Sequence, residues 1–179
     1  MKFLKTVLRI ILVILVLSVL NRWYLGGFSQ LEVKEQAVGP YTLAYMNFTG
    51  EYAKVWPTMD EVYTMLSWAG IVSYTGIGIY YDDPSVVSGS DLRSDIGAIV
   101  TTADAAKLTQ GLSIKTIDTA QRMIIEFPFK NSISIMAGVI KVYPLLKEYM
   151  KAKWYTSVPI TELYATSAKK IYYIADIVK

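Results

Sequence analysis

The sequence predicts an α+β domain, an antiparallel sheet with two main helices, preceded by one N-terminal transmembrane helix. Two observations carry this prediction: a single apolar run lies near the N-terminus, and a pattern of strands and a helix then occurs twice. Of the 179 residues, we assign 1–27 to a membrane anchor and hinge and 28–179 to the domain. The two repeats are expected at about 28–104 and 105–179, so each is a strand–helix–strand–strand module preceded by a further strand.

The anchor is predicted from the run Ile10–Leu20, which only Ser18 interrupts. As a helix this run is roughly 17 Å long, which is short for a hydrocarbon core of about 30 Å. Lys5 and Arg9 before the run, and Trp23 after it, suit the two interfaces of a bilayer and extend the segment that could span it. We therefore expect a single-pass signal anchor.

A cleaved signal peptide is the alternative, because a basic start followed by an apolar run is common to both. The small residues that a cleavage site requires are poorly placed around Ser18 and Gly27. Lys2, Lys5 and Arg9 outweigh Arg22 in charge. The positive-inside rule then predicts a cytoplasmic N-terminus and a domain outside the cytoplasm; cleavage would give a secreted domain instead.

The charge and composition exclude several classes of function. The net charge is +3 and the pI is about 8.9, but residues 31–179 hold 14 basic and 15 acidic side chains. The basic character belongs to the N-terminal segment, which argues against nucleic acid as a partner. The chain has no Cys and no His, which excludes thiolate nucleophiles, Ser-His-Asp triads and His-ligated metal or haem. We expect no metal and no cofactor.

The first repeat is predicted to contain four strands and one helix. Its strands are expected at 31–36, 41–48, 76–81 and 92–101, where apolar residues alternate or run between turn signals. The helix is expected over 53–69, with apolar residues every three or four positions. Pro57 must lie in the first turn of this helix or kink it, and Gly70 is a candidate C-cap.

The second repeat follows the same pattern. Its strands are expected at 112–117, 121–127, 158–164 and 170–177, and its helix at 131–153, with Pro144 signalling a kink or an early break. The repeats are offset by about 80 residues, so that Val62-Tyr63 falls on Val142-Tyr143. Such a duplication has pseudo-two-fold symmetry, and a cleft between the two halves is a usual place for a ligand.

Five short motifs occur in the order found in a known protein family. They are Gly39-Pro40-Tyr41, Phe48-Thr49-Gly50-Glu51-Tyr52, Gly78-Ile79-Tyr80-Tyr81-Asp82-Asp83-Pro84, Leu92-Arg93-Ser94-Asp95-Ile96-Gly97 and Glu162-Leu163-Tyr164. Over about residues 31–178 the chain resembles the GyrI-like family. The resemblance implies the duplicated fold just described, and small-molecule binding, since members include effector-binding domains of multidrug-responsive regulators, stand-alone binders, a DNA-gyrase inhibitor and some hydrolases.

Three further segments are similar to a membrane-anchored branch of that family, which includes the animal ER-phagy receptor with a GyrI-like domain. They are Leu92-Arg93-Ser94-Asp95, Glu126-Phe127-Pro128 and Lys141-Val142-Tyr143-Pro144. The sequence has no long acidic tail to carry an autophagy motif, so we do not expect that role here.

Glu162 is the first candidate for a functional residue. The resemblance places it at the acidic position that faces the ligand cleft, and strand alternation puts it on one face with Ile160 and Tyr164. A carboxylate among aromatic rings suits cationic, amphipathic ligands, because the charge pairs with the cation and the rings add cation–π contact. The alternative is a solvated face or a structural core network.

The remaining candidates are less constrained. Glu126 either faces the cleft from the symmetric position or lies on the polar side of an edge strand. The aromatic candidates for the cavity wall lie near the predicted helices and central strands, and ordinary core packing is the alternative role for each. They are Trp56, Tyr63, Tyr80, Tyr81 and Tyr143. Arg93 and Asp95 are expected to form an ion pair.

Three functions remain open from the sequence. The first is a membrane-tethered domain that binds a small apolar or cationic ligand in the cleft between its repeats. The second is a membrane-anchored scaffold with a vestigial cleft and a protein partner. The third is a hydrolase that depends on Glu162, for which the sequence offers no separate nucleophile and base. Under the first of these functions, which we favour, the protein is a binding module rather than an enzyme.

Overall fold

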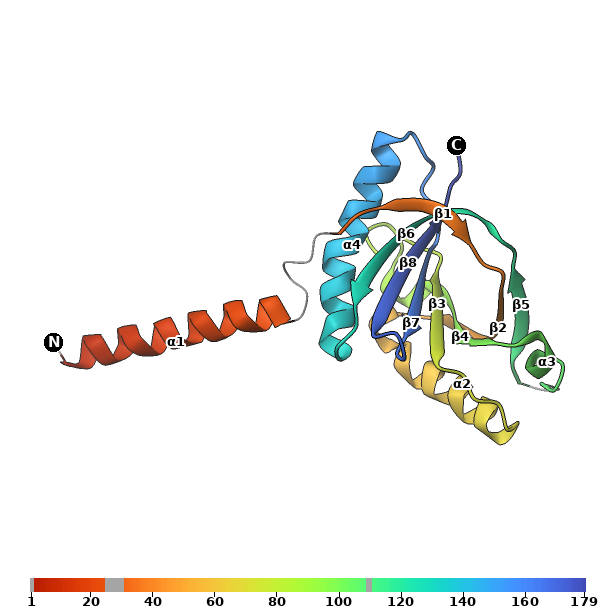
Figure 1. The fold of residues 1–179 in the computed structure, drawn as a ribbon, viewed down its shortest axis with the longest axis horizontal. Helices are drawn as coiled ribbons and strands as arrows, with labels where there is room; N and C mark the ends of the chain where they lie inside the picture. The colour runs from red at the N-terminus through yellow and green to blue at the C-terminus, as the bar shows by residue number, and fades with distance from the viewer. Residues whose placement is uncertain (1, 25–30, 109–110) are drawn as a thin grey trace.

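The structure, a computed structural model, describes residues 2–24, 31–108 and 111–179. The eight strands predicted from the sequence all form. They are β1 (Lys34–Val38), β2 (Tyr41–Thr49), β3 (Thr75–Tyr80), β4 (Arg93–Val100), β5 (Ser113–Ile117), β6 (Ala120–Pro128), β7 (Ile160–Ala165) and β8 (Lys170–Asp176). Together with the helices they make the α+β architecture that the sequence predicts (Figure 1).

All eight strands form one antiparallel sheet in the order β1-β6-β8-β7-β3-β4-β2-β5. The order is symmetric about the central β3–β7 pair, in which Gly78 lies opposite Glu162 and Gly76 opposite Tyr164. The first strand of each half pairs with the other half, since β1 pairs with β6 and β5 with β2. This exchange closes the two halves into one curled sheet (Figure 1).

Two long helices, α2 (Trp56–Trp68) and α4 (Ser132–Ala152), lie on one side of the sheet (Figure 1). α2 has Pro57 in its first turn, where the missing N–H costs no helical hydrogen bond. Gly70 follows its end with φ of +69°, a left-handed conformation that suits glycine after a helix. Short helical turns occur at η1 (Tyr52–Lys54), η2 (Gly89–Asp91) and α3 (Thr102–Ala105).

The sequence predicted a kink or an early break at Pro144; helix α4 continues through that residue, so the early break does not occur. Asn131 caps its start by accepting a hydrogen bond from the backbone N–H of Ser134. Pro144 is exposed. On that outer side water can solvate the carbonyl of Ile140, which loses its partner N–H to the proline ring.

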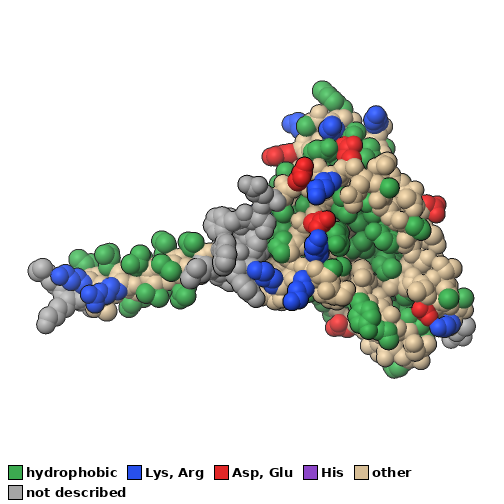
Figure 2. Space-filling view, viewed as in Figure 1, with side chains coloured by type: hydrophobic (Ala, Val, Ile, Leu, Met, Phe, Trp, Pro, Cys, Tyr) green, Lys and Arg blue, Asp and Glu red, His purple; other side chains and the backbone are tan. Residues whose placement is uncertain are grey.

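The sheet has a hydrophobic layer on each face. Between the sheet and the helices lies the larger layer, which includes Phe127, Leu146 and Tyr173. The hollow of the curled sheet is lined by hydrophobic side chains (Figure 2). Leu43 and Ile77 are among the buried members of this second layer. Because both faces are covered there, a central strand such as β3 is buried along nearly its whole length.

The N-terminal helix α1 covers Lys2–Tyr24. Hydrophobic side chains cover its surface and basic residues lie toward its start (Figure 2). Among the residues that the structure describes, no helix combines the length and apolar character needed to cross a membrane. The transmembrane helix predicted from the sequence is therefore not found there.

The other differences from the prediction lie at element ends. The first strand begins at Lys34 rather than at residue 31, and Leu31 and Val33 before it pack against the larger hydrophobic layer as irregular chain. Helix α2 begins at Trp56, since residues 52–54 form a tighter turn. The short helix α3 was not predicted; four residues are too few to show a helical period.

Candidate ligand-binding site

A cavity of about 430 Å³ lies between the sheet and the two long helices. Its volume is in the range typical of small-molecule sites. Its wall consists of rings and apolar side chains around one carboxylate: Tyr52, Ala53, Val55, Trp56, Tyr80, Pro84, Ser132, Ile135, Met136, Val139, Tyr143, Glu162 and Tyr164. The residues come from both repeats, so this is the cleft between halves that the duplication predicts.

Glu162 supplies the charge in this wall. Glu162 lies on the central strand β7 and is only 2% exposed. The hydroxyl of Tyr143, from α4, donates to Oε1 at 2.7 Å, and the hydroxyl of Tyr164 donates to Oε2 at 2.7 Å. Both carboxylate oxygens are therefore held by neutral donors, one from a helix and one from the sheet.

Burial raises the pKa of Glu162 to about 7, and the hydrogen bonds from Tyr143 and Tyr164 oppose that rise. No lysine or arginine is among the groups that shift its pKa. Removal from water disfavours the charged form, and only donated hydrogen bonds compensate for it. The carboxyl group thus changes charge near neutral pH, and among the described residues no cationic side chain contributes to balancing it when it is ionised.

A chain of hydroxyls extends from Glu162 into the other repeat. The hydroxyls of Tyr80 and Tyr164 lie 3.0 Å apart. Because Tyr164 already donates to Glu162, the proton between the two tyrosines belongs to Tyr80. Burial raises the pKa of both hydroxyls, Tyr80 and Tyr164, so they remain neutral donors at any physiological pH.

Two glycines of β3 make room for these rings. A Cβ at Gly78 would lie 2.8 Å from the Tyr80 hydroxyl, and one at Gly76 would lie 3.4 Å from the ring of Tyr164. A side chain at residue 78 would therefore displace the ring that lies beside Glu162. The Gly-x-Gly spacing serves packing of the cavity wall.

Aromatic rings complete the wall on the side of α2. The rings of Tyr52 and Tyr80 meet edge to face with centroids 4.8 Å apart, and those of Trp56 and Tyr164 lie 5.7 Å apart. Such pairs fix the ring orientations. Trp56 is 39% exposed although it lines the cavity, so it lies where the cavity meets the surface.

Five of the eight residues proposed from the sequence line this cavity: Trp56, Tyr80, Tyr143, Glu162 and Tyr164. Glu126 does not. Glu126 lies on β6, which is an interior strand of the sheet. Its exposed side chain pairs with Lys170. Alternation puts it with Ile124 on the concave face, so it lies on the side of the sheet away from the helices.

Tyr63 and Tyr81 also lie outside the cavity. Tyr63, on α2, packs against the hydrophobic layers, and its hydroxyl would lie 3.3 Å from a Cβ at Gly76. Tyr81 follows β3 and donates to Asp95 at 2.6 Å. Since Tyr80 and Tyr81 are adjacent in an extended chain, their side chains point to opposite faces, and of the two only Tyr80 lines the cavity.

Asp95 is a second buried carboxylate, 4% exposed, and it corrects the predicted pair with Arg93. It accepts hydrogen bonds from Asn47 at 2.7 Å and from Tyr81 at 2.6 Å, and it pairs with Lys115 at 3.3 Å. Arg93 pairs with Asp82 instead, at 2.7 Å. Unlike Glu162, Asp95 has a cation beside it, so its network is already balanced in charge.

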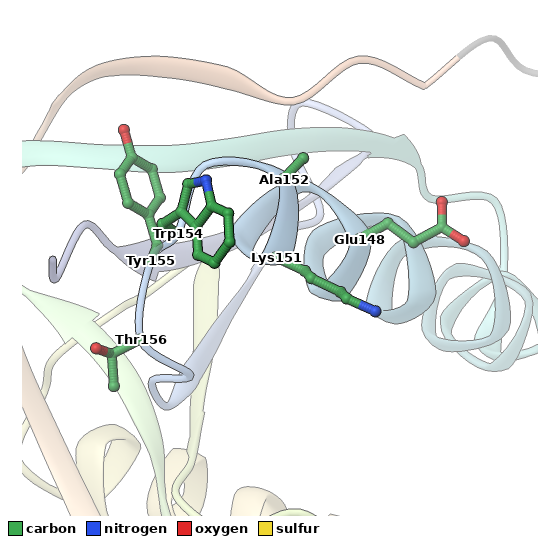
Figure 3. Close-up of a pocket in the computed structure, with 6 residues that line it drawn as sticks. All are labelled: Glu148, Lys151, Ala152, Trp154, Tyr155 and Thr156. Atoms are coloured by element: carbon green, nitrogen blue, oxygen red, sulfur yellow. The ribbon is translucent and has the colours of Figure 1, made fainter.

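Another hollow, of about 640 Å³, lies at the end of α4 and is a different kind of feature. Figure 3 shows Glu148 and Lys151 on α4, and Trp154 and Tyr155 along the chain that leaves the helix. Trp154 is 90% exposed. The size of a surface hollow alone does not make it a site.

Several lining residues were not among the sequence candidates. Tyr52 lies in the turn before α2, where no period predicts its direction. Ile135 and Val139 could be placed on the inner face of α4 by their spacing, but that spacing does not distinguish a cavity wall from a filled core. Met136 is the least expected, because it lines the cavity and is also 66% exposed.

The fold and the site define a class: duplicated α+β domains with a buried acid in an aromatic cavity between the repeats. The GyrI-like small molecule binding domain matches residues 31–173. The chain therefore belongs to the GyrI-like family, as the motifs indicate. No curated protein sequence matches the chain.

Solved structures show the same fold at low sequence identity. The EcmrR–DNA complex has a TM-score of 0.63 at 11% identity, with 98% of this chain and 69% of that chain covered. An integron cassette protein of Vibrio cholerae has a TM-score of 0.56 at 10% identity, with 83% and 96% covered. SAV2435 bound to tetraphenylphosphonium has a TM-score of 0.52 at 19% identity, with 83% and 94% covered.

Proposed function

We propose that this protein binds a cationic, amphipathic small molecule in the cavity, with its charge against Glu162 and its apolar groups against the rings. The observation that carries the proposal is the carboxylate of Glu162, which lies in an apolar wall, is 2% exposed and has no cation among the groups that shift its pKa. A buried charge is costly unless it is paired. A cationic ligand supplies the missing partner.

The chemistry of the wall favours a cation whose charge is spread over a large apolar body. Such a cation loses little hydration energy on burial, and the rings of Trp56, Tyr80 and Tyr164 offer it cation–π contact. A compact ammonium ion is strongly hydrated and would lose more. Tetraphenylphosphonium, found on SAV2435, has the required character and is a suitable probe.

Binding is better supported than a scaffold role or hydrolysis. A vestigial cleft would be filled by side chains, whereas this cavity holds about 430 Å³. Hydrolysis would need a nucleophile and a base in contact, whereas both oxygens of Glu162 are engaged by the tyrosine hydroxyls, Tyr143 and Tyr164. A protein partner of the domain remains a separate prediction.

We also propose that the N-terminal segment holds the domain at a membrane, with the domain outside the cytoplasm. The support is the apolar run Ile10–Leu20, the basic residues before it, and the exposure of large hydrophobic side chains along α1. Hydrophobic side chains in such number need an apolar environment. We also propose that the chain belongs to the membrane-anchored branch of the family, on the basis of the three similar sequence segments.

Isothermal titration with tetraphenylphosphonium tests the proposed ligand class. We expect saturable binding at one site in the full chain, and a loss of about tenfold or more in affinity in Glu162→Gln, since a charge-paired contact contributes about 1.5–3 kcal/mol. Glu126→Gln is the matched control, because it removes the same charge outside the cavity and should bind as the wild type does. Equal affinity in Glu162→Gln and wild type would refute the proposal.

A further inference from the structure

The outward face of α4 carries an apolar stripe next to the cavity. Ile133, Met136 and Ile140 are 55%, 66% and 67% exposed, and their spacing places them on one side of the helix. We call these three residues the outer stripe. The outward face of a surface helix is normally polar or charged. Across the parts of the chain that the structure describes, this stripe is left open to solvent.

The charged residues that the helix itself places beside the outer stripe are basic. Residues 131–140 include no charged side chain, and Lys130 and Lys141 come directly before and after them. Lys147, further along the helix, pairs with Asp83. An apolar face bordered by basic residues is the pattern of helices that lie in the interface of anionic membranes. A protein partner would need an acidic rim around an apolar centre to fit the same surface.

The outer stripe is continuous with the mouth of the cavity. Met136 belongs to the stripe and also lines the cavity, and Trp56 lines the cavity while being 39% exposed. Whatever covers the stripe therefore covers the mouth. A lipid surface at this position would give the cavity an apolar entrance.

The length of chain between α1 and the sheet permits this contact. α1 ends at Tyr24 and β1 begins at Lys34, so residues 25–33 connect them. Nine residues span at most about 30 Å when fully extended. A domain held by an N-terminal segment in a bilayer would thus stay close to that bilayer.

We propose that the outer stripe rests on an anionic bilayer and that the cavity takes its cationic ligand from the lipid phase. The inference depends on the proposed function of the same cavity and names the source of its ligand. Amphipathic cations concentrate in anionic bilayers. An entrance on the membrane surface would let such a ligand pass from lipid to cavity without crossing water.

Single cysteines can report the position of the stripe, because the chain has no native Cys. The full chain is placed in phosphatidylcholine vesicles that contain phosphatidylglycerol, with a polarity-sensitive fluorophore on Ile140→Cys. Val72→Cys is the matched control, since Val72 is 72% exposed and follows α2. We expect a blue shift, and quenching by brominated lipid, at residue 140 and neither at residue 72. Equal signals at the two positions, or no association with the vesicles, would overturn the inference.

A second variant separates this inference from the proposed function. Ile133→Ser with Ile140→Ser changes the stripe at two residues that do not line the cavity. We expect this double variant to bind tetraphenylphosphonium normally in detergent solution and several-fold more slowly from preloaded vesicles. Unchanged uptake from vesicles would contradict the membrane entrance alone. Unchanged binding in Glu162→Gln under both conditions would contradict the cationic site itself.

Discussion

The hydroxyl of Tyr143 donates to Oε1 of Glu162 across 2.7 Å, and it does so from a helix, whereas the second donor, Tyr164, lies on the same strand as the acid. The position of α4 over the sheet therefore controls one of the two bonds that support the ionised carboxylate. Movement of α4 would alter the charge state of the cavity as well as its shape. Several measurable consequences follow from this pair.

Ligand affinity should depend on pH. Burial raises the pKa of Glu162 to about 7, and the cation binds the ionised form. Affinity for tetraphenylphosphonium should therefore be constant well above pH 7 and fall as the pH drops below it, by up to tenfold per pH unit. Titration calorimetry from pH 5 to pH 9 measures this, and a flat profile would contradict the role of the carboxylate.

Removal of either donor hydroxyl should raise the pKa of Glu162 further. The hydrogen bonds from Tyr143 and Tyr164 lower that pKa, so Tyr143→Phe and Tyr164→Phe should each raise it, by about one unit. Tyr80→Phe is the control, because Tyr80 bonds to Tyr164 and not to the acid. The carboxyl carbon shift of Glu162, followed by NMR against pH, gives the three values.

The stability of the fold should decrease as Glu162 ionises. Its pKa is raised from 4.5 to about 7, so the folded state binds the proton more tightly than the unfolded state does. The resulting stabilisation is complete below about pH 4.5 and is lost as the pH rises through 7, up to about 3 kcal/mol in all. Relative to wild type, Glu162→Gln should gain stability between pH 5 and pH 8. Urea unfolding of both proteins at pH 5 and at pH 8 measures the difference in their free energies of unfolding. A difference that is the same at the two pH values would contradict the raised pKa.

The two glycines of β3 should differ in their tolerance of a methyl group. A Cβ at Gly78 would lie 2.8 Å from the Tyr80 hydroxyl, whereas the nearest atom to one at Gly76 is 3.3 Å away. Gly78→Ala should cost about 1–3 kcal/mol of stability by overpacking and weaken ligand binding by displacing Tyr80. Gly76→Ala is the control on the same strand and should cost less. Denaturant unfolding with a binding titration compares them.

The strands were accessible from sequence for physical reasons, since alternation and turn residues mark each of them. The choice of Glu162 came from the resemblance to the GyrI-like family, and alternation added only that it shares a face with Tyr164. The position of Glu126 was not accessible, because the apolar run Met123-Ile124-Ile125 before it does not show which face of β6 points toward the helices. The pairing of β1 with β6 is a contact between distant segments, which local periodicity does not encode.

The size of the cavity was also beyond the sequence. Ile135 and Val139 have the spacing of core residues, and only the packing of α4 against β6 and β8 decides that space remains between them and Glu162. The exposure of Met136 depends on the same packing. Sequence patterns predict which faces are apolar, whereas the cavity depends on how far apart those faces stand.

The pKa of Glu162 with and without ligand tests the central claim most directly. Selectively labelled protein can be titrated by NMR in the absence of tetraphenylphosphonium and again at saturation. A cation in contact with the carboxylate stabilises its ionised form, so the pKa should fall from about 7 by one unit or more in the complex. An unchanged or raised pKa at saturation would show that the ligand charge lies elsewhere, and would contradict the proposed site.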